Sequence, residues 1–104
     1  MIKKKLIYGP WTVDQGKVYR HHRLVPNLSP QRYDPSLVAL GASIRRVRME
    51  LGISQEKLAL VAEVDRSYLG RVERGDNNVA MLTLVKIAHG LGTTVSRLVI
   101  DAKL

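Results

Sequence analysis

The sequence predicts an all-α domain of five helices behind an arm that is irregular or forms a β-hairpin, and two observations lead to this prediction. All four prolines lie within the first 35 of the 104 residues, so the rest of the chain is free of this helix breaker. From Ser36 onward apolar residues recur at helical spacing, whereas residues 1–34 contain short β-prone runs broken by glycine and proline. We therefore divide the chain into a basic arm, residues 1–35, and a helical domain, residues 36–104.

The first predicted helix carries an apolar stripe whose members are three or four residues apart. It ends at Gly52, because glycine is a common cap at the helix C-terminus. The stripe consists of Leu37, Leu40, Ile44, Val47 and Leu51.

Two short helices are expected next, each behind a residue that can cap a helix N-terminus. Ser54 is the N-cap candidate of the second helix and Asp65 that of the third, which Gly75 closes. The residues expected to be buried are Leu58, Ala59, Ala62, Leu69 and Val72.

A fourth helix, residues 81–91, is too apolar to be exposed on all sides, so we expect it to form the floor of the core. Thr93 or Thr94 can cap a last short helix, which carries more apolar surface than one small domain needs. We assign this surface to a homodimer interface formed by Val95, Leu98, Val99 and Ile100.

Composition narrows the class of partner. Seventeen Lys and Arg against nine Asp and Glu give a net charge of +8, which favours nucleic acid first and an acidic membrane surface second. The chain has no cysteine, and no apolar run approaches the roughly 18 residues of a membrane span. We expect a cytoplasmic protein that does not enter a membrane.

Residues 51–75, LGISQEKLALVAEVDRSYLGRVERG, have the order of a helix-turn-helix motif: a first helix that braces the second, a short turn, and a second helix that projects. This run strongly resembles the lambda-repressor/Cro, or XRE-type, family of transcriptional regulators, and the resemblance covers roughly residues 37–100. Within that family the Arg66-Ser-Tyr-Leu run and the Val-Glu-Arg-Gly ending resemble restriction-modification controller proteins. One departure is Glu63, at a turn position often filled by glycine, where a left-handed backbone would be mildly strained.

The resemblance implies a five-helix lambda-repressor-like domain that binds double-stranded DNA as a homodimer, with helix 65–74 in the major groove of a near-palindromic operator. Base contacts are expected from Arg66, Ser67 and Arg71, because they lie near the start of that helix and an arginine can bind guanine with two hydrogen bonds. Phosphate contacts are expected from Gln55, Tyr68, Arg74, Asn77 and Asn78.

Two of these expectations leave alternatives open. For Tyr68, a contact to DNA and packing of its ring against the domain carry equal weight. The resemblance further implies a structural ion pair between Arg48 and Glu73. If that pair is shielded from water, loss of one partner is expected to cost about 3 to 5 kcal/mol, whereas an exposed pair contributes under about 1 kcal/mol.

The arm holds seven basic and two acidic residues, so most of the excess charge lies outside the motif. Three interpretations carry similar weight: the arm follows phosphates or enters the minor groove, it is a soluble extension, or residues 11–13 and 17–19 form a hairpin that pairs with another subunit. Candidate DNA contacts in the arm are Lys3, Lys4, Lys5, Arg20 and Arg23.

Other classes of function are disfavoured. His21 and His22 are adjacent and His89 stands alone, so no metal-ligand spacing appears, and no nucleophile or phosphate-loop motif is present. We therefore expect no catalytic residues, metal or cofactor. The alternative function is a protein-interaction module, such as an antitoxin or anti-activator, that uses the same fold and binds a protein partner through the arm.

Overall fold

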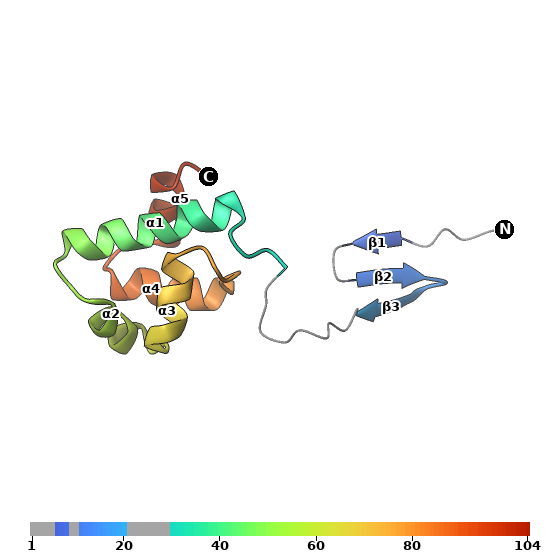
Figure 1. Cartoon of the computed structure of the whole chain (residues 1–104), viewed down its shortest axis with the longest axis horizontal. Coiled ribbons are helices and arrows are strands. Elements are labelled where there is room, and N and C mark those ends of the chain that lie inside the picture. Colours follow the sequence, from blue (N-terminus) through green and yellow to red (C-terminus); the bar gives the residue numbers. More distant parts are fainter. Residues whose placement is uncertain (1–5, 9–10, 21–29) are drawn as a thin grey trace.

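The computed structural model describes residues 6–8, 11–20 and 30–104, which form five helices and a small sheet (Figure 1). The helices are α1 (Pro35–Glu50), α2 (Gln55–Ala62), α3 (Arg66–Glu73), α4 (Met81–Gly90) and α5 (Val95–Asp101). The predicted five-helix domain is therefore confirmed, and of the two forms expected for the arm, irregular or β-hairpin, the structure has the β-hairpin. None of the described helices combines the length and the apolar character needed to cross a membrane.

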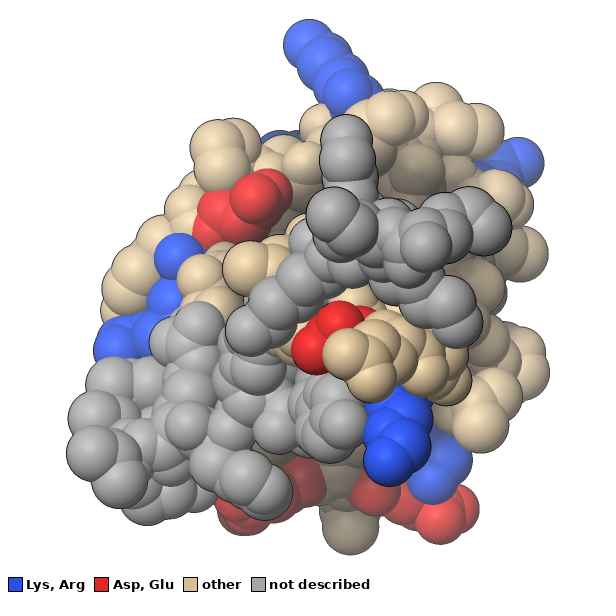
Figure 2. Space-filling model, turned by 90° about the vertical axis from the view of Figure 1, so that its right-hand side faces the viewer, with Lys and Arg blue, Asp and Glu red and all other residues tan. Residues whose placement is uncertain are grey.

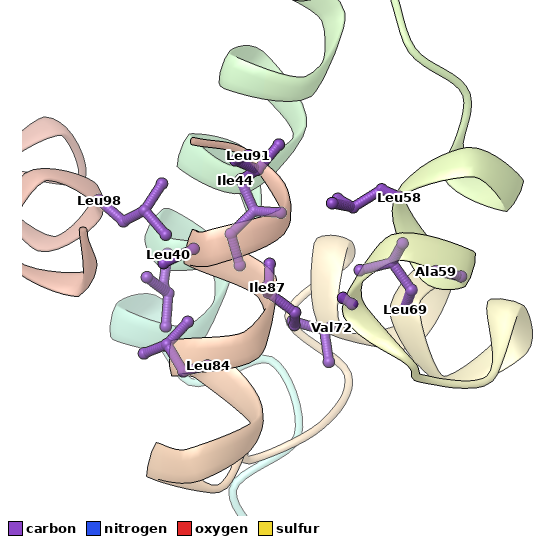
Figure 3. Close-up of a cluster of buried hydrophobic side chains, with 12 residues drawn as sticks. Leu40, Ile44, Leu58, Ala59, Leu69, Val72, Leu84, Ile87, Leu91 and Leu98 are labelled. Atoms are coloured by element: carbon purple, nitrogen blue, oxygen red, sulfur yellow. The ribbon is translucent and has the colours of Figure 1, made fainter. Parts of the chain in front are cut away.

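The core lies where α1, α2, α3 and α4 meet, with α5 packed on α1 and α4 (Figure 3). Its fully buried large side chains come one from each helix: Ile44, Leu58, Leu69, Ile87 and Leu98. The apolar residues predicted to be buried in the second and third helices are all in this core. In the stripe of α1, by contrast, Leu51 is exposed, because it lies beyond the last turn of the helix.

The helix ends follow the predicted caps in most cases. The Ser54 hydroxyl accepts a hydrogen bond from the Lys57 amide, and the Thr94 hydroxyl accepts one from the Arg97 amide. Helix α1 begins at Pro35, one residue before the expected start, because Asp34 caps it by accepting from the Ser36 amide.

In the turn between α2 and α3, Glu63 has the left-handed backbone expected at a position that glycine often fills in this family. Glu63 has φ 57° and ψ 43°, and its amide donates back to the end of α2. A residue with a Cβ is strained there by about 1 kcal/mol or more, which the packing of the two helices has to offset.

Helix α5 is fastened to α1 by polar contacts as well as by packing. The buried Ser43 hydroxyl lies 3.0 Å from the Leu98 carbonyl oxygen and 2.8 Å from Asp101 Oδ2, and the Arg46 guanidinium pairs with the same carboxylate. These bonds from Arg46 first and Ser43 second lower the pKa of Asp101.

The arm contains a three-stranded antiparallel sheet in the order β1 (Leu6–Tyr8), β2 (Trp11–Asp14) and β3 (Lys17–Arg20). The hairpin β2–β3 closes on Gln15 and Gly16, which both have positive φ, as a two-residue type I′ turn requires. The sheet and the helices are joined through residues outside the described ranges, so we treat them as separate units.

Candidate nucleic-acid interface

Helix α3 has one buried and one exposed side, and the predicted base-contacting residues share the exposed side. At 100° per residue, Arg66, Ser67, Arg71 and Arg74 lie within an arc of about 140°. All four are exposed, whereas Leu69 and Val72 point to the core. Neither Arg66 nor Arg71 pairs with a carboxylate among the described residues, so both guanidinium groups are available to a ligand.

The buried side of α3 is held to α1 by the predicted ion pair. Arg48 Nε donates to Glu73 Oε2 at 2.7 Å, and Arg48 Nη2 donates to Oε1 at 3.0 Å. The side chains are only 12% and 2% exposed, so the pair is of the shielded kind. It fixes the orientation of α3 relative to α1 and leaves neither charge for DNA.

Gln55, the first residue of α2, joins this network. Its side-chain amide donates to Glu73 Oε1 at 3.0 Å, which uses one of its two amide hydrogens. Gly70 lies beside it: a Cβ at Gly70 would be in ordinary contact with Gln55 Oε1, at 3.7 Å, and close to Arg74 Nη1, at 3.3 Å. The structure thus brings together two predicted phosphate contacts, Gln55 and Arg74.

Tyr68 lies between the buried and exposed sides. Its half-buried ring packs against the core, which agrees with the packing alternative. The Arg71 guanidinium lies 6.0 Å from the ring centroid, at the outer limit of a cation–π contact. The ring therefore supports Arg71 from one side.

At the start of α3, Asp65 occupies the N-cap position but makes no capping hydrogen bond, which corrects the prediction that its side chain caps the helix. Its Oδ2 instead accepts a hydrogen bond from the Ser67 hydroxyl. Both residues are exposed.

The loop after α3 holds Asn77, half-buried, and Asn78, exposed. Asp76 in this loop pairs with Arg32, which raises the pKa of the arginine, and the Tyr33 amide donates to the Gly75 carbonyl at 2.7 Å. Residues just before α1 are thus attached to the loop that follows α3. The sequence carried no signal for this pairing, because the partners are 44 residues apart.

Of the candidate arm contacts, Lys3, Lys4, Lys5 and Arg23 lie outside the described residues, and Arg20 ends β3. Figure 2 shows one face of the molecule, on which the described basic and acidic side chains alternate instead of forming one basic patch.

The predicted dimer interface needs one correction. Leu98 is 1% exposed and belongs to the core of its own chain, because it faces α1 and α4. Val95 and Val99 are half-buried, and Ile100 is 73% exposed beside a groove of about 660 Å³ that Val47 and Thr93 also line. Helical spacing alone did not distinguish the core side of α5 from its outer side.

Comparisons with known proteins agree with this geometry. The helix-turn-helix family model HTH_3 matches residues 44–98. The control protein C.MunI of a Mycoplasma species is 37% identical over 65 residues, which are 62% of this chain and 88% of that protein.

Two solved structures are similar in fold and sequence. The restriction-modification controller protein C.AhdI from Aeromonas hydrophila is 42% identical with a TM-score of 0.59, over 60% of this chain and 94% of that one. A nucleoprotein complex of C.Esp1396I is 29% identical with a TM-score of 0.60, over 66% of this chain and 94% of that one. The family model covers more than half of the chain, and the chain therefore belongs to the helix-turn-helix family of DNA-binding transcriptional regulators and is related to restriction-modification controller proteins.

Proposed function

We propose that the protein regulates transcription by binding a near-palindromic operator as a homodimer, with α3 of each subunit in the major groove. The observation that carries this proposal is the exposed side of α3, on which two arginines that pair with no carboxylate of the described residues flank a hydroxyl side chain. Arg66 and Arg71 each read guanine O6 and N7, and Ser67 contacts a neighbouring base.

Phosphate contacts hold the helix in register. Gln55 donates its second amide hydrogen to a phosphate, and Arg74 beside it binds the same strand, since both lie over Gly70. Asn77, Asn78 and the Tyr68 hydroxyl add contacts along the backbone.

The homodimer is supported by Ile100 on α5, which is 73% exposed and lines a groove, and by the half-buried Val95 and Val99 of the same helix. A C.Esp1396I controller structure that the chain resembles is a nucleoprotein complex, which supports double-stranded DNA as the ligand. A dimer would place its two recognition helices about one helical turn, roughly 34 Å, apart.

The test is binding of the full chain to labelled duplex DNA from upstream of its own gene, over a salt series. We expect Arg66→Ala and Arg71→Ala each to weaken operator binding by about 5- to 150-fold while random DNA is affected less. Arg45→Ala, which removes the same charge from an exposed position on α1, is the matched control and should keep full discrimination. Equal binding to operator and random DNA by wild type would refute the proposal.

Protein binding by the arm is a second candidate, because the sheet exposes apolar side chains. Ile7 is 67%, Trp11 39% and Val18 62% exposed. Deletion of residues 1–29 keeps Arg32, Tyr33 and the Asp34 cap in place. Loss of a co-purifying protein with intact operator binding would favour this role, and weaker DNA binding with a smaller salt dependence would favour arm contacts to DNA.

A further inference from the structure

The N-terminus of α3 carries a carboxylate that makes no capping hydrogen bond. Asp65 is exposed, makes no hydrogen bond to the helix amides and forms no ion pair among the described residues. Its one described partner is the Ser67 hydroxyl. On a surface that has to approach phosphates, an unpaired negative charge weakens binding to every DNA sequence unless it meets a hydrogen-bond donor.

The direction of the Asp65–Ser67 hydrogen bond fixes what the two side chains can recognise. An ionised carboxylate only accepts hydrogen bonds, so the Ser67 hydroxyl must donate its single hydrogen to Asp65. Toward a third group Ser67 then presents only lone pairs. The pair is therefore an acceptor-only surface, next to the donor-only guanidinium of Arg66.

The bases also differ in whether the exocyclic group that they present in the major groove accepts or donates a hydrogen bond. Guanine and thymine present acceptors at their O6 and O4 positions, whereas cytosine N4 and adenine N6 are amino donors. A pair of side chains that only accepts hydrogen bonds therefore repels the O6 of guanine and the O4 of thymine, and binds the amino groups of cytosine and adenine.

We propose that Asp65, with Ser67 held as an acceptor, is a specificity-determining residue that selects a base bearing an exocyclic amino group beside the guanine read by Arg66. This inference rests on the proposed function, because it requires α3 to lie in the major groove. It assigns to Asp65 a role in rejecting guanine and thymine, at the expense of affinity for DNA in general.

The experiment starts from the duplex that the full wild-type chain selects from a randomised library. Wild type, Asp65→Ala and Ser67→Ala are then titrated against all four base pairs at each half-site position. At one position wild type should prefer cytosine or adenine by about 5- to 150-fold. Asp65→Ala should lose that preference, keep the guanine preference that Arg66→Ala abolishes, and bind random DNA more tightly.

Two base analogues identify the source of the amino group. If cytosine is read, 2-pyrimidinone at that position, which lacks only the N4 amine, lowers wild-type affinity and leaves Asp65→Ala unchanged. If adenine is read, unsubstituted purine, which lacks the N6 amine, has that effect instead.

The controls separate failure of this inference from failure of the proposed function. Glu50→Gln removes one negative charge at the exposed end of α1 and should leave every base preference intact. Thermal melting should show that Asp65→Ala is folded, with Tm lowered by no more than roughly 4 to 8 °C, because it removes a charge at the helix N-terminus but no capping hydrogen bond. The role of Asp65 is overturned if wild type binds DNA sequence-specifically and Asp65→Ala has the same base preferences, or weaker preferences by the same factor at every position. A wild type without any preference overturns the proposed function itself.

Discussion

Replacing Arg48 by methionine should destabilise the domain severely, because it leaves the Glu73 carboxylate buried without its cation. Glu73 is 2% exposed and accepts two hydrogen bonds from Arg48, at 2.7 and 3.0 Å. Arg48 also donates to the Ile53 carbonyl at 3.0 Å, so the substitution removes a partner from the α1–α2 connection as well. Gln55 is the other described donor to this carboxylate, and a single neutral amide does not replace a charge.

The size of the effect follows from the burial of the pair. Removing one partner of a buried ion pair costs about 3 to 5 kcal/mol, against a total stability of roughly 5 to 15 kcal/mol for a domain. In a domain of this size each kcal/mol lowers Tm by roughly 4 to 8 °C, so we expect a decrease of about 12 °C or more.

The assay is thermal and urea unfolding followed by circular dichroism for Arg48→Met, Glu73→Leu and the double variant. The double variant should recover much of the lost stability, because it removes the unpaired charge along with its partner. A loss below about 1 kcal/mol in the single variants is the value for an exposed pair and would refute the reasoning from burial.

Three further predictions concern the helices around the site. Gly41→Ala should cost about 3 kcal/mol or more in urea unfolding, because its Cβ would lie 2.3 Å from a carbonyl oxygen of α3; unchanged stability would mean that α1 and α3 do not pack so closely. Glu63→Gly should stabilise the domain by up to about 1 kcal/mol, since it relieves a left-handed residue at φ 57°, and a fall in Tm would contradict this. The lowered pKa of Asp101 means that its bonds to Arg46 and Ser43 stabilise the fold above the ordinary carboxyl pKa of about 3.9 and are lost as pH falls through its lower folded value. Asp101→Asn should therefore have a lower Tm than wild type at pH 6, and the two should converge on acidification toward pH 2; a constant difference would exclude this linkage.

Much of the helical unit is predictable from local sequence, because local rules determine it. Ser54 is followed by a helix whose first amides need an acceptor, and Leu58 is buried because its spacing places it on the stripe that faces the core. Asp65 stands at an equally good cap position, yet its carboxylate binds Ser67 instead, since two acceptable partners compete and sequence does not rank them.

The features that escaped prediction depend on contacts between distant segments. Arg32 was counted with the arm, but its partner Asp76 is in the loop after α3, and nothing near either residue indicates the other. Leu98 belongs to an apolar run that is equally suited to a core and to an interface, and only the packing of α5 on α1 and α4 decides between them. The exposure of Arg66 and Arg71, by contrast, follows from the helical period alone.

Helix α1 carries none of the residues proposed to read DNA, yet α3, which carries them, and α5, which carries Ile100, both pack on it. Arg48 and Gly41 set the position of α3, whereas Ser43 and Arg46 set that of α5. In a dimer joined through α5, the distance between the two recognition helices depends on how far α3 lies from α5 within each subunit. Helix α1 fixes that distance, because both helices are attached to it. Changes to the buried face of α1 would then alter which half-site spacing the protein tolerates, without changing a residue that contacts DNA or the other subunit.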